Sequence, residues 1–327
     1  MTRSERERDS ILHIADGDMT AQRLKQSGVP GEILSWQEAA IHGPSPGGVV
    51  LGEWQAIRAD FLARSAGVPS AEVLRSLESM HASLRDHREE IVLWFGEESF
   101  CQHNLASVVS SIMDDRVQRV SIVGLGTGAS GRATHGSDLE VAELLTGYES
   151  RTELGIVRRD ELNAFWRAFS DSDPSRMLRL SREAEASARI VALACSHLQR
   201  FPSAHNGLGV LENTLLTLVA SGIHRFDELF ETYAERNPSS GLGDVQILDH
   251  LTRLANCDQP LVSLEGDPPD TLITILPVGH EVLSGQRDFV ELNGIDLWLG
   301  GVHMTGSTSL WRWDTASSTL VTQSGGA

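Results

Sequence analysis

Hydrophobic and polar positions between residues 11 and 123 follow two periods in turn. Short apolar runs predict four strands, at 11–16, 31–36, 89–96 and 116–124. An amphipathic stretch between the first two runs predicts a helix over 19–28, with Asp18 as its N-cap and Gly28 as its stop. Strands that alternate with helices favour a parallel sheet covered by helices. Residues 11–126 are therefore expected to form an α/β, Rossmann-like domain.

The rest of the chain shows different patterns of hydrophobic and polar residues. Residues 138–205 show a helical, arginine-rich pattern and are expected to form a helical connector. Residues 206–327 contain three apolar-periodic helices, followed by runs typical of strands. The helices are expected at 208–222, 226–237 and 243–257, and the strands at 260–266, 271–285 and in the Trp-rich end. Three helices followed by a β-hairpin is the order of a winged helix, so a C-terminal winged-helix-like α+β domain is predicted.

Two further segments are expected to lack regular structure. The charged stretch 1–10 is predicted to be a disordered tail. The Gly-rich stretch 127–137 is predicted to be a flexible linker. Its glycine spacing also resembles a dinucleotide-binding loop, but polar residues stand where that motif needs an amphipathic helix to begin. We therefore predict no nicotinamide site here.

Charge and lysine content exclude several chemistries. The 327 residues carry a net charge of −18, and Lys25 is the single lysine. No GxxxxGK[ST] sequence occurs, so there is no P-loop nucleotide signature. Lys25 lies in a polar helical stretch, which disfavours a Schiff base and hence pyridoxal phosphate. The acidity is expected to repel anionic membranes and nucleic acid.

The cysteines and the N-terminus suggest a compartment. Cys101, Cys195 and Cys257 have no disulfide or metal-knuckle spacing, and buried inert thiols are expected. No secretory signal and no apolar run of membrane-spanning length is recognisable. A cytoplasmic location without membrane contact is therefore expected.

Several stretches together resemble the bacterial domain-of-unknown-function family numbered 1835. They run in order over nearly the whole chain: ILHIADGD, GEILSWQEAAIHGP, VLWFGEESFCQ, FWRAFSDSDP, FPSAHNGLGVLENTLL, GLGD, NGIDLWLGGVHM and WRWD. The resemblance implies a fold more than an activity. After Trp94 the family usually carries a His-Asp pair followed by another Asp, where this chain has Glu97, Glu98 and Cys101. The Gly-rich stretch is also particular to this chain.

Polar residues follow three of the predicted strands. Because parallel strands end at the same sheet edge, where ligands bind, these residues are candidates for one site. They are Asp16, Gly17 and Asp18 after the first strand, Trp36, Glu38 and His42 after the second, and Glu98, Gln102 and His103 after the third. Glu38, His42, Glu98 and His103 are the acid–base candidates, and the others are expected to bind substrate. Asp16, Asp18 and Glu98 permit a divalent metal, although no spacing demands one.

Each of these residues also has a structural interpretation. Asp16 and Asp18 are common at a turn and a helix cap, and residues 38–44 would serve equally as a surface loop. Cys101 is a candidate nucleophile beside His103, but residues two apart do not face each other on a helix.

The C-terminal segment adds a second set of polar residues. Asp296 and His303 stand among apolar residues that favour burial, and both are candidates for substrate binding. In the structural alternative, the two side chains satisfy each other in a hairpin.

Two classes of function follow. The first is an intracellular enzyme that acts on a small polar substrate by acid–base or metal-assisted hydrolysis or group transfer. The second is a regulatory or adaptor protein whose winged-helix-like region makes protein contacts, including those of a homodimer. Direct DNA binding is disfavoured, because residues 208–285 contain twelve acidic and three basic residues.

Overall fold

The computed structural model describes residues 10–85, 88–112, 117–125, 136, 139–307 and 310–323. Nearly all of the predicted tail and linker therefore lies outside the described residues. The chain divides into two compact units, Met1–Ser172 and Asp173–Ala327. The division falls within the segment predicted to be a helical connector.

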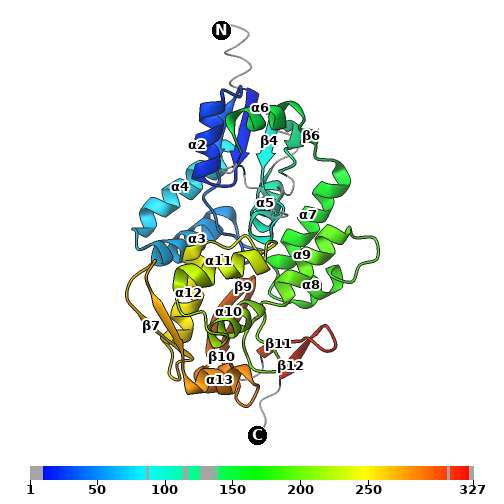
Figure 1. Ribbon diagram of the computed structural model, residues 1–327. Helices are drawn as coiled ribbons and strands as arrows, with labels where there is room; N and C mark the ends of the chain where they lie inside the picture. Colours follow the sequence, from blue (N-terminus) through cyan, green and yellow to red (C-terminus); the bar gives the residue numbers. More distant parts are fainter. Residues whose placement is uncertain are drawn as a thin grey trace. The chain divides into compact units, whose positions relative to one another are not determined.

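The first unit is built around a five-stranded sheet (Figure 1). Its strands are β1 (Ile11–Ala15), β2 (Glu32–Ser35), β4 (Arg88–Trp94), β5 (Val117–Ile122) and β6 (Thr152–Glu153), with β3 (Gly43–Pro44) as a further short strand of the unit. Its helices are α2 (Asp18–Ser27), α3 (Leu51–Ala66), α4 (Ser70–Ser83), α5 (Ser99–Ser111), α6 (Val141–Glu149) and α7 (Ile156–Phe169).

The strand order is β2-β1-β4-β5-β6. The first four strands are parallel, as the sequence predicts. Strand β6, which the hydrophobic pattern does not predict, pairs antiparallel to β5 at the edge. The chain leaves β1 for β2 on one side and then returns past β1 to β4 on the other. The carboxyl ends of β1 and β4 are thus a topological switch point, where open α/β sheets bind ligands.

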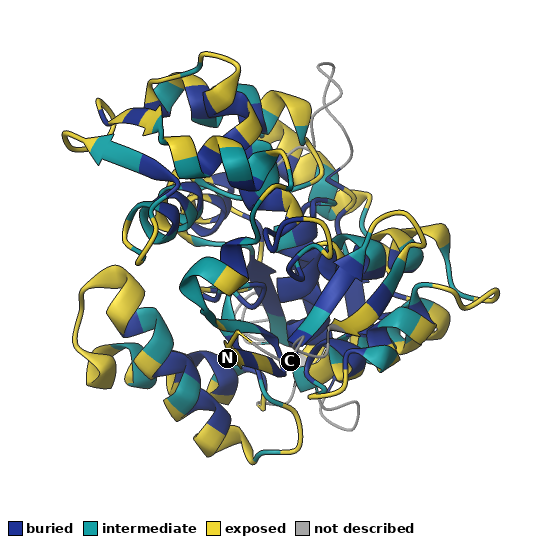
Figure 2. Ribbon diagram, turned by 90° about the horizontal axis from the view of Figure 1, so that it is seen from below, coloured by how far each residue is buried: buried dark blue, intermediate teal, exposed yellow. Residues whose placement is uncertain are grey.

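Helices α2 and α6 cover one face of the sheet. A buried apolar cluster joins Ala15 of β1 and Trp94 of β4 to Leu24 of α2 and Leu144 of α6. Alternate residues of a strand point to opposite faces, so Leu12 and Ile14 face the other layer. Both are fully buried, and burial is concentrated in the central strands (Figure 2).

Helix α2 shows one correct and one wrong prediction about its ends. Gly28 has a φ of 76° and ends the helix in the left-handed conformation, as predicted. Asp18 was predicted to be the N-cap but is the first helical residue, and Gly17 is the N-cap. Gly17 has a φ of 128°, a conformation that favours glycine, so the turn out of β1 depends on it.

The second unit is helical at first and ends in hairpins. Its helices are α8 (Ser175–Leu180), α9 (Ala188–Leu198), α10 (Val210–Ala220), α11 (Phe226–Arg236), α12 (Asp244–Ala255), α13 (Pro277–Leu283) and α14 (Phe289–Asn293). Its strands are β7 (Val262–Glu265), β8 (Leu272–Ile275), β9 (Ile295–Gly300), β10 (Val302–Gly306), β11 (Leu310–Asp314) and β12 (Thr319–Gln323).

These strands pair as three antiparallel hairpins, β7–β8, β9–β10 and β11–β12. The three predicted helices correspond to α10, α11 and α12. The prediction of a strand over 271–285 was wrong in its second half, because Pro277 opens helix α13. Among the described residues, none of the helices combines the length and the hydropathy needed to cross a bilayer.

Candidate functional site

Two carboxylates lie at the switch point of the sheet. Asp16 directly follows β1, and its backbone N–H donates to the carbonyl of Trp94 at the end of β4 over 3.2 Å. Glu98 comes four residues after Trp94 and is the N-cap of α5. The parallel pairing of β1 with β4 therefore brings residues from two distant segments to the same edge.

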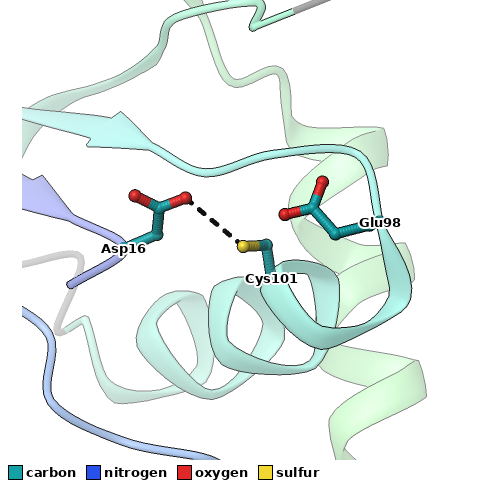
Figure 3. A group of neighbouring side chains, drawn as sticks. All are labelled: Asp16, Glu98 and Cys101. Atoms are coloured by element: carbon teal, nitrogen blue, oxygen red, sulfur yellow. Dashed lines mark hydrogen bonds between the residues drawn. The ribbon is translucent and has the colours of Figure 1, made fainter. Parts of the chain in front are cut away.

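Cys101 of α5 completes the cluster (Figure 3). Its thiol donates to Oδ2 of Asp16 over 3.3 Å. The ligand atoms of Asp16, Glu98 and Cys101 all lie within 4.8 Å of one another. Cys101 and Glu98 are buried, whereas Asp16 is half-buried, so the cluster meets the surface at Asp16.

The environment of Cys101 keeps its thiol protonated. Burial raises its pKa most strongly, and the nearby carboxylates of Asp16 and Glu98 raise it further. Cys101 thus serves as a hydrogen-bond donor in the described structure. The Oδ1 atom of Asp16 is shielded from solvent and has no hydrogen-bond partner among the described residues.

The position of Glu98 depends on Gly96. A Cβ atom at residue 96 would overlap both carboxylate oxygens of Glu98, so only glycine leaves room for this arrangement. Gln102 fixes the same turn, because its Nε2 donates to the carbonyl of Gly96 over 2.6 Å. Arg158 of α7 in turn donates to Oε1 of Gln102 over 2.8 Å.

Two helices begin at the cluster. Helix α2 starts after Gly17, and helix α5 starts after Glu98. Neither N-terminus receives a side-chain capping hydrogen bond from its N-cap residue. The first backbone N–H groups of a helix have no partner within the helix and favour oxygen atoms with negative charge. The cluster thus combines acidic side chains with donors for a polar ligand.

Glu38, predicted as the acid–base partner of His42, forms an ion pair with Arg58 of α3 in the structure. Both oxygens of Glu38 accept from Arg58 of α3, and the two side chains are completely buried. Arg58 also donates to the backbone carbonyls of Ala39, His42 and Pro44. Glu38 therefore anchors the loop after β2, and His42 contributes its backbone to the same network.

The other predicted residues near the strand ends are held elsewhere. Asp18 is exposed and accepts from Nε2 of Gln37 over 2.8 Å. Trp36 is buried and packs edge-on against His81 of α4, with ring centroids 5.3 Å apart. His103 turns toward α7, where it lies edge-on to Phe165 and Phe169.

Asp296 and His303 belong to the second unit. His303 donates from Nε2 to Oδ1 of Asp296 over 2.7 Å and stacks on Trp298. The three side chains lie on one face of the β9–β10 hairpin, where Trp298 and His303 are cross-strand partners. Asp296 is 81% exposed, so burial does not force a functional role on this pair. The arrangement matches the structural alternative in which the two side chains satisfy each other.

Sequence comparison adds no family. No protein-family model and no curated protein sequence matches this chain. The resemblance to the family numbered 1835 therefore stays a prediction, and the proposed function depends on the geometry of the cluster.

The predicted site included Asp16 and Glu98 of the cluster but neither Cys101 nor Gly96. The sequence suggested Cys101 only as a nucleophile beside His103, which lies on another side of α5. The useful signal was the spacing of three between Glu98 and Cys101, because residues three apart at a helix start share a face. Gly96 gave a second signal, since a glycine directly before two carboxylates allows a close approach of backbone and side chain.

Proposed function

We propose that this protein is an enzyme that acts on a small polar substrate by hydrolysis or group transfer, with its site at the carboxyl ends of β1 and β4. The observation that supports the proposal is the convergence of Asp16, Glu98 and Cys101 at the switch point of the sheet. Three chemically reactive groups seldom gather there for packing alone, because buried carboxylates are costly to keep together.

We assign roles to the two carboxylates, to the helix N-termini and to Gln102. The carboxylates of Asp16 and Glu98 supply the general base that accepts a proton from water or from a substrate hydroxyl. The N–H groups at the starts of α2 and α5 bind a substrate oxygen and stabilise negative charge that develops on it. Gln102 acts as a positioning residue, because it holds the Gly96 turn that carries Glu98.

Steady-state assays of the full chain on a panel of chromogenic carboxylic and phosphoric esters test this proposal. We expect turnover of at least one ester class, and a loss of kcat of roughly 100-fold in both Asp16→Asn and Glu98→Gln. Asp18→Asn is the matched control, because Asp18 lies at the same turn but bonds to Gln37. An absence of turnover across the panel, or full activity in both variants, would contradict the proposal.

For the second unit we propose a winged-helix-like arrangement of α10, α11, α12 and the β7–β8 hairpin. The element order supports it, as does an antiparallel bridge between Arg225, before α11, and Leu272 of β8. Its exposed side chains are rich in carboxylates, including Glu228, Glu231 and Glu235 along α11. An adaptor role through contacts with a basic protein surface is therefore the alternative function, and this charge opposes duplex DNA.

A further inference from the structure

We infer that Asp16, Glu98 and Cys101 bind one thiophilic divalent cation of the zinc class. This inference deepens the proposed function and rests on the same site, because it names the ion that the site would use. Each carboxylate offers one oxygen to the ion, and its other oxygen stays available to accept a proton. The three side chains offer two carboxylates and one sulfur, and both donor types are common zinc ligands.

The spacing of the donor atoms fits an ion. Ligand atoms around a tetrahedral zinc ion lie roughly 3.5 Å apart, given typical zinc–oxygen and zinc–sulfur distances. Asp16 Oδ2 and Cys101 Sγ are already 3.3 Å apart, and all three donors lie within 4.8 Å. Changes in side-chain rotamer within about 1 Å would close the remaining difference, without movement of β1 or α5.

The Asp16 carboxylate is under-satisfied, and its second oxygen lies on the side away from Cys101 (Figure 3). Oδ1 of Asp16 is shielded from solvent and accepts no hydrogen bond from the described residues. A carboxylate oxygen shielded from water is unfavourable unless a hydrogen-bond donor or positive charge compensates for the lost hydration. Within the described part of the chain, the same carboxylate accepts a hydrogen bond from the thiol of Cys101, which is a weak donor.

The donor set selects the class of ion. Magnesium and calcium prefer oxygen ligands alone, whereas a thiolate favours zinc and cobalt. On binding, the proton of Cys101 leaves to solvent, and the sulfur coordinates as a thiolate. Three protein ligands leave a fourth position for water or substrate, which is typical of catalytic rather than structural zinc sites.

Titration of chelator-treated full-length protein with Co²⁺ tests the inference, because a cobalt–thiolate bond gives a near-ultraviolet charge-transfer band. We expect the band to saturate at one ion per chain, and zinc to abolish it while millimolar magnesium does not. Cys101→Ser should lose the band, whereas Cys195→Ser, which replaces a thiol outside the cluster, should keep it. No band in the wild-type protein, or an unchanged band in Cys101→Ser, would overturn the inference.

A second variant covers the case in which Cys101→Ser does not fold. Gly96→Ala keeps the thiol but displaces the Glu98 carboxylate. We expect it to keep the cobalt–thiolate band with an affinity at least about tenfold lower. Unchanged affinity in this variant and in Glu98→Gln would overturn the assignment of Glu98 as a ligand.

The readout separates this inference from the proposed function, since cobalt binding needs no substrate. A protein that binds cobalt through Cys101 but keeps full ester turnover in both Asp16→Asn and Glu98→Gln would sustain the metal site and overturn the proposed catalytic role of the two carboxylates. A protein whose turnover depends on both carboxylates but which shows no cobalt–thiolate band would sustain the proposed enzyme and overturn the metal site.

Discussion

The indole N–H of Trp94 donates a hydrogen bond to Nδ1 of His13 over 3.0 Å. Nε2 of His13 must then carry the ring proton, and it donates to the carbonyl of Pro30 over 3.0 Å. Burial lowers the pKa of His13, against a smaller opposite effect of the Pro30 hydrogen bond. His13 of β1 is therefore a neutral, buried group whose two ring nitrogens both form hydrogen bonds.

This tautomer has a consequence for stability at acidic pH. The folded-state pKa of His13 lies below its ordinary value of 6.5, so its contribution to stability is complete above about pH 6.5 and decreases as the pH falls below it. Nitrogen NMR of labelled protein should show Nδ1 unprotonated and Nε2 protonated at pH 7, with a midpoint of titration below 6.5. A midpoint at or above 6.5 would contradict this expectation.

Glu90 is a second source of acid sensitivity. Burial by itself raises the pKa of Glu90 most strongly, but hydrogen bonds from Arg151, Arg119 and Ser121 outweigh it and lower the pKa to about 2. Its contribution is therefore present above about pH 4.5 and is lost as the pH falls toward 2.

We expect Glu90→Gln to lower the free energy of unfolding by roughly 2 kcal/mol at pH 7, with half-exposed Arg119 limiting the effect. Urea denaturation measures the loss. Its neighbour Glu89 is exposed, so Glu89→Gln should stay within about 0.5 kcal/mol of the wild type. Equal losses in the two variants would show that the ion pairs of Glu90 do not stabilise the sheet.

Glu38 should behave as a structural residue. Glu38→Gln leaves the Arg58 charge completely buried without its partner, which is expected to cost roughly 3 kcal/mol. The melting temperature of Glu38→Gln should fall clearly. The melting temperature of Asp16→Asn, which changes a half-buried position, should stay at the wild-type value. A Glu38→Gln protein with unchanged melting but no activity would instead support the acid–base role predicted from the sequence.

Gly96→Ala separates the site from the fold. Its added methyl group meets the flexible end of Glu98 rather than the backbone, so the melting temperature should change little. Catalytic turnover should nevertheless fall at least about tenfold, because the carboxylate is displaced. A large loss of stability in Gly96→Ala would contradict this interpretation of the turn.

The second unit should not bind duplex DNA. Helix α11 of this unit is rich in exposed carboxylates, and DNA affinity depends on neutralising phosphates. A fluorescence anisotropy titration with labelled duplex at low salt should show no binding at micromolar protein. Tight binding that weakens with added salt would contradict the charge argument.

The sequence predicted where in the sheet the site lies better than it predicted which side chains form it. Alternating strand and helix patterns placed Asp16 and Glu98 at neighbouring parallel strand ends, because strand order follows general topological rules. Side-chain partners do not follow from such rules. Arg58 lies 20 residues from Glu38 and donates hydrogen bonds to its carboxylate. Cys101 lies 85 residues from Asp16, to which its thiol donates. Those pairings depend on packing between elements, which periodicity does not encode.

X-ray absorption at the zinc edge of zinc-loaded protein tests most directly whether Asp16, Glu98 and Cys101 form one site. The account predicts a single sulfur neighbour at about 2.3 Å and oxygen neighbours at about 2.0 Å, with the sulfur signal lost in Cys101→Ser. A zinc environment without sulfur, or one unchanged by Cys101→Ser, would contradict it.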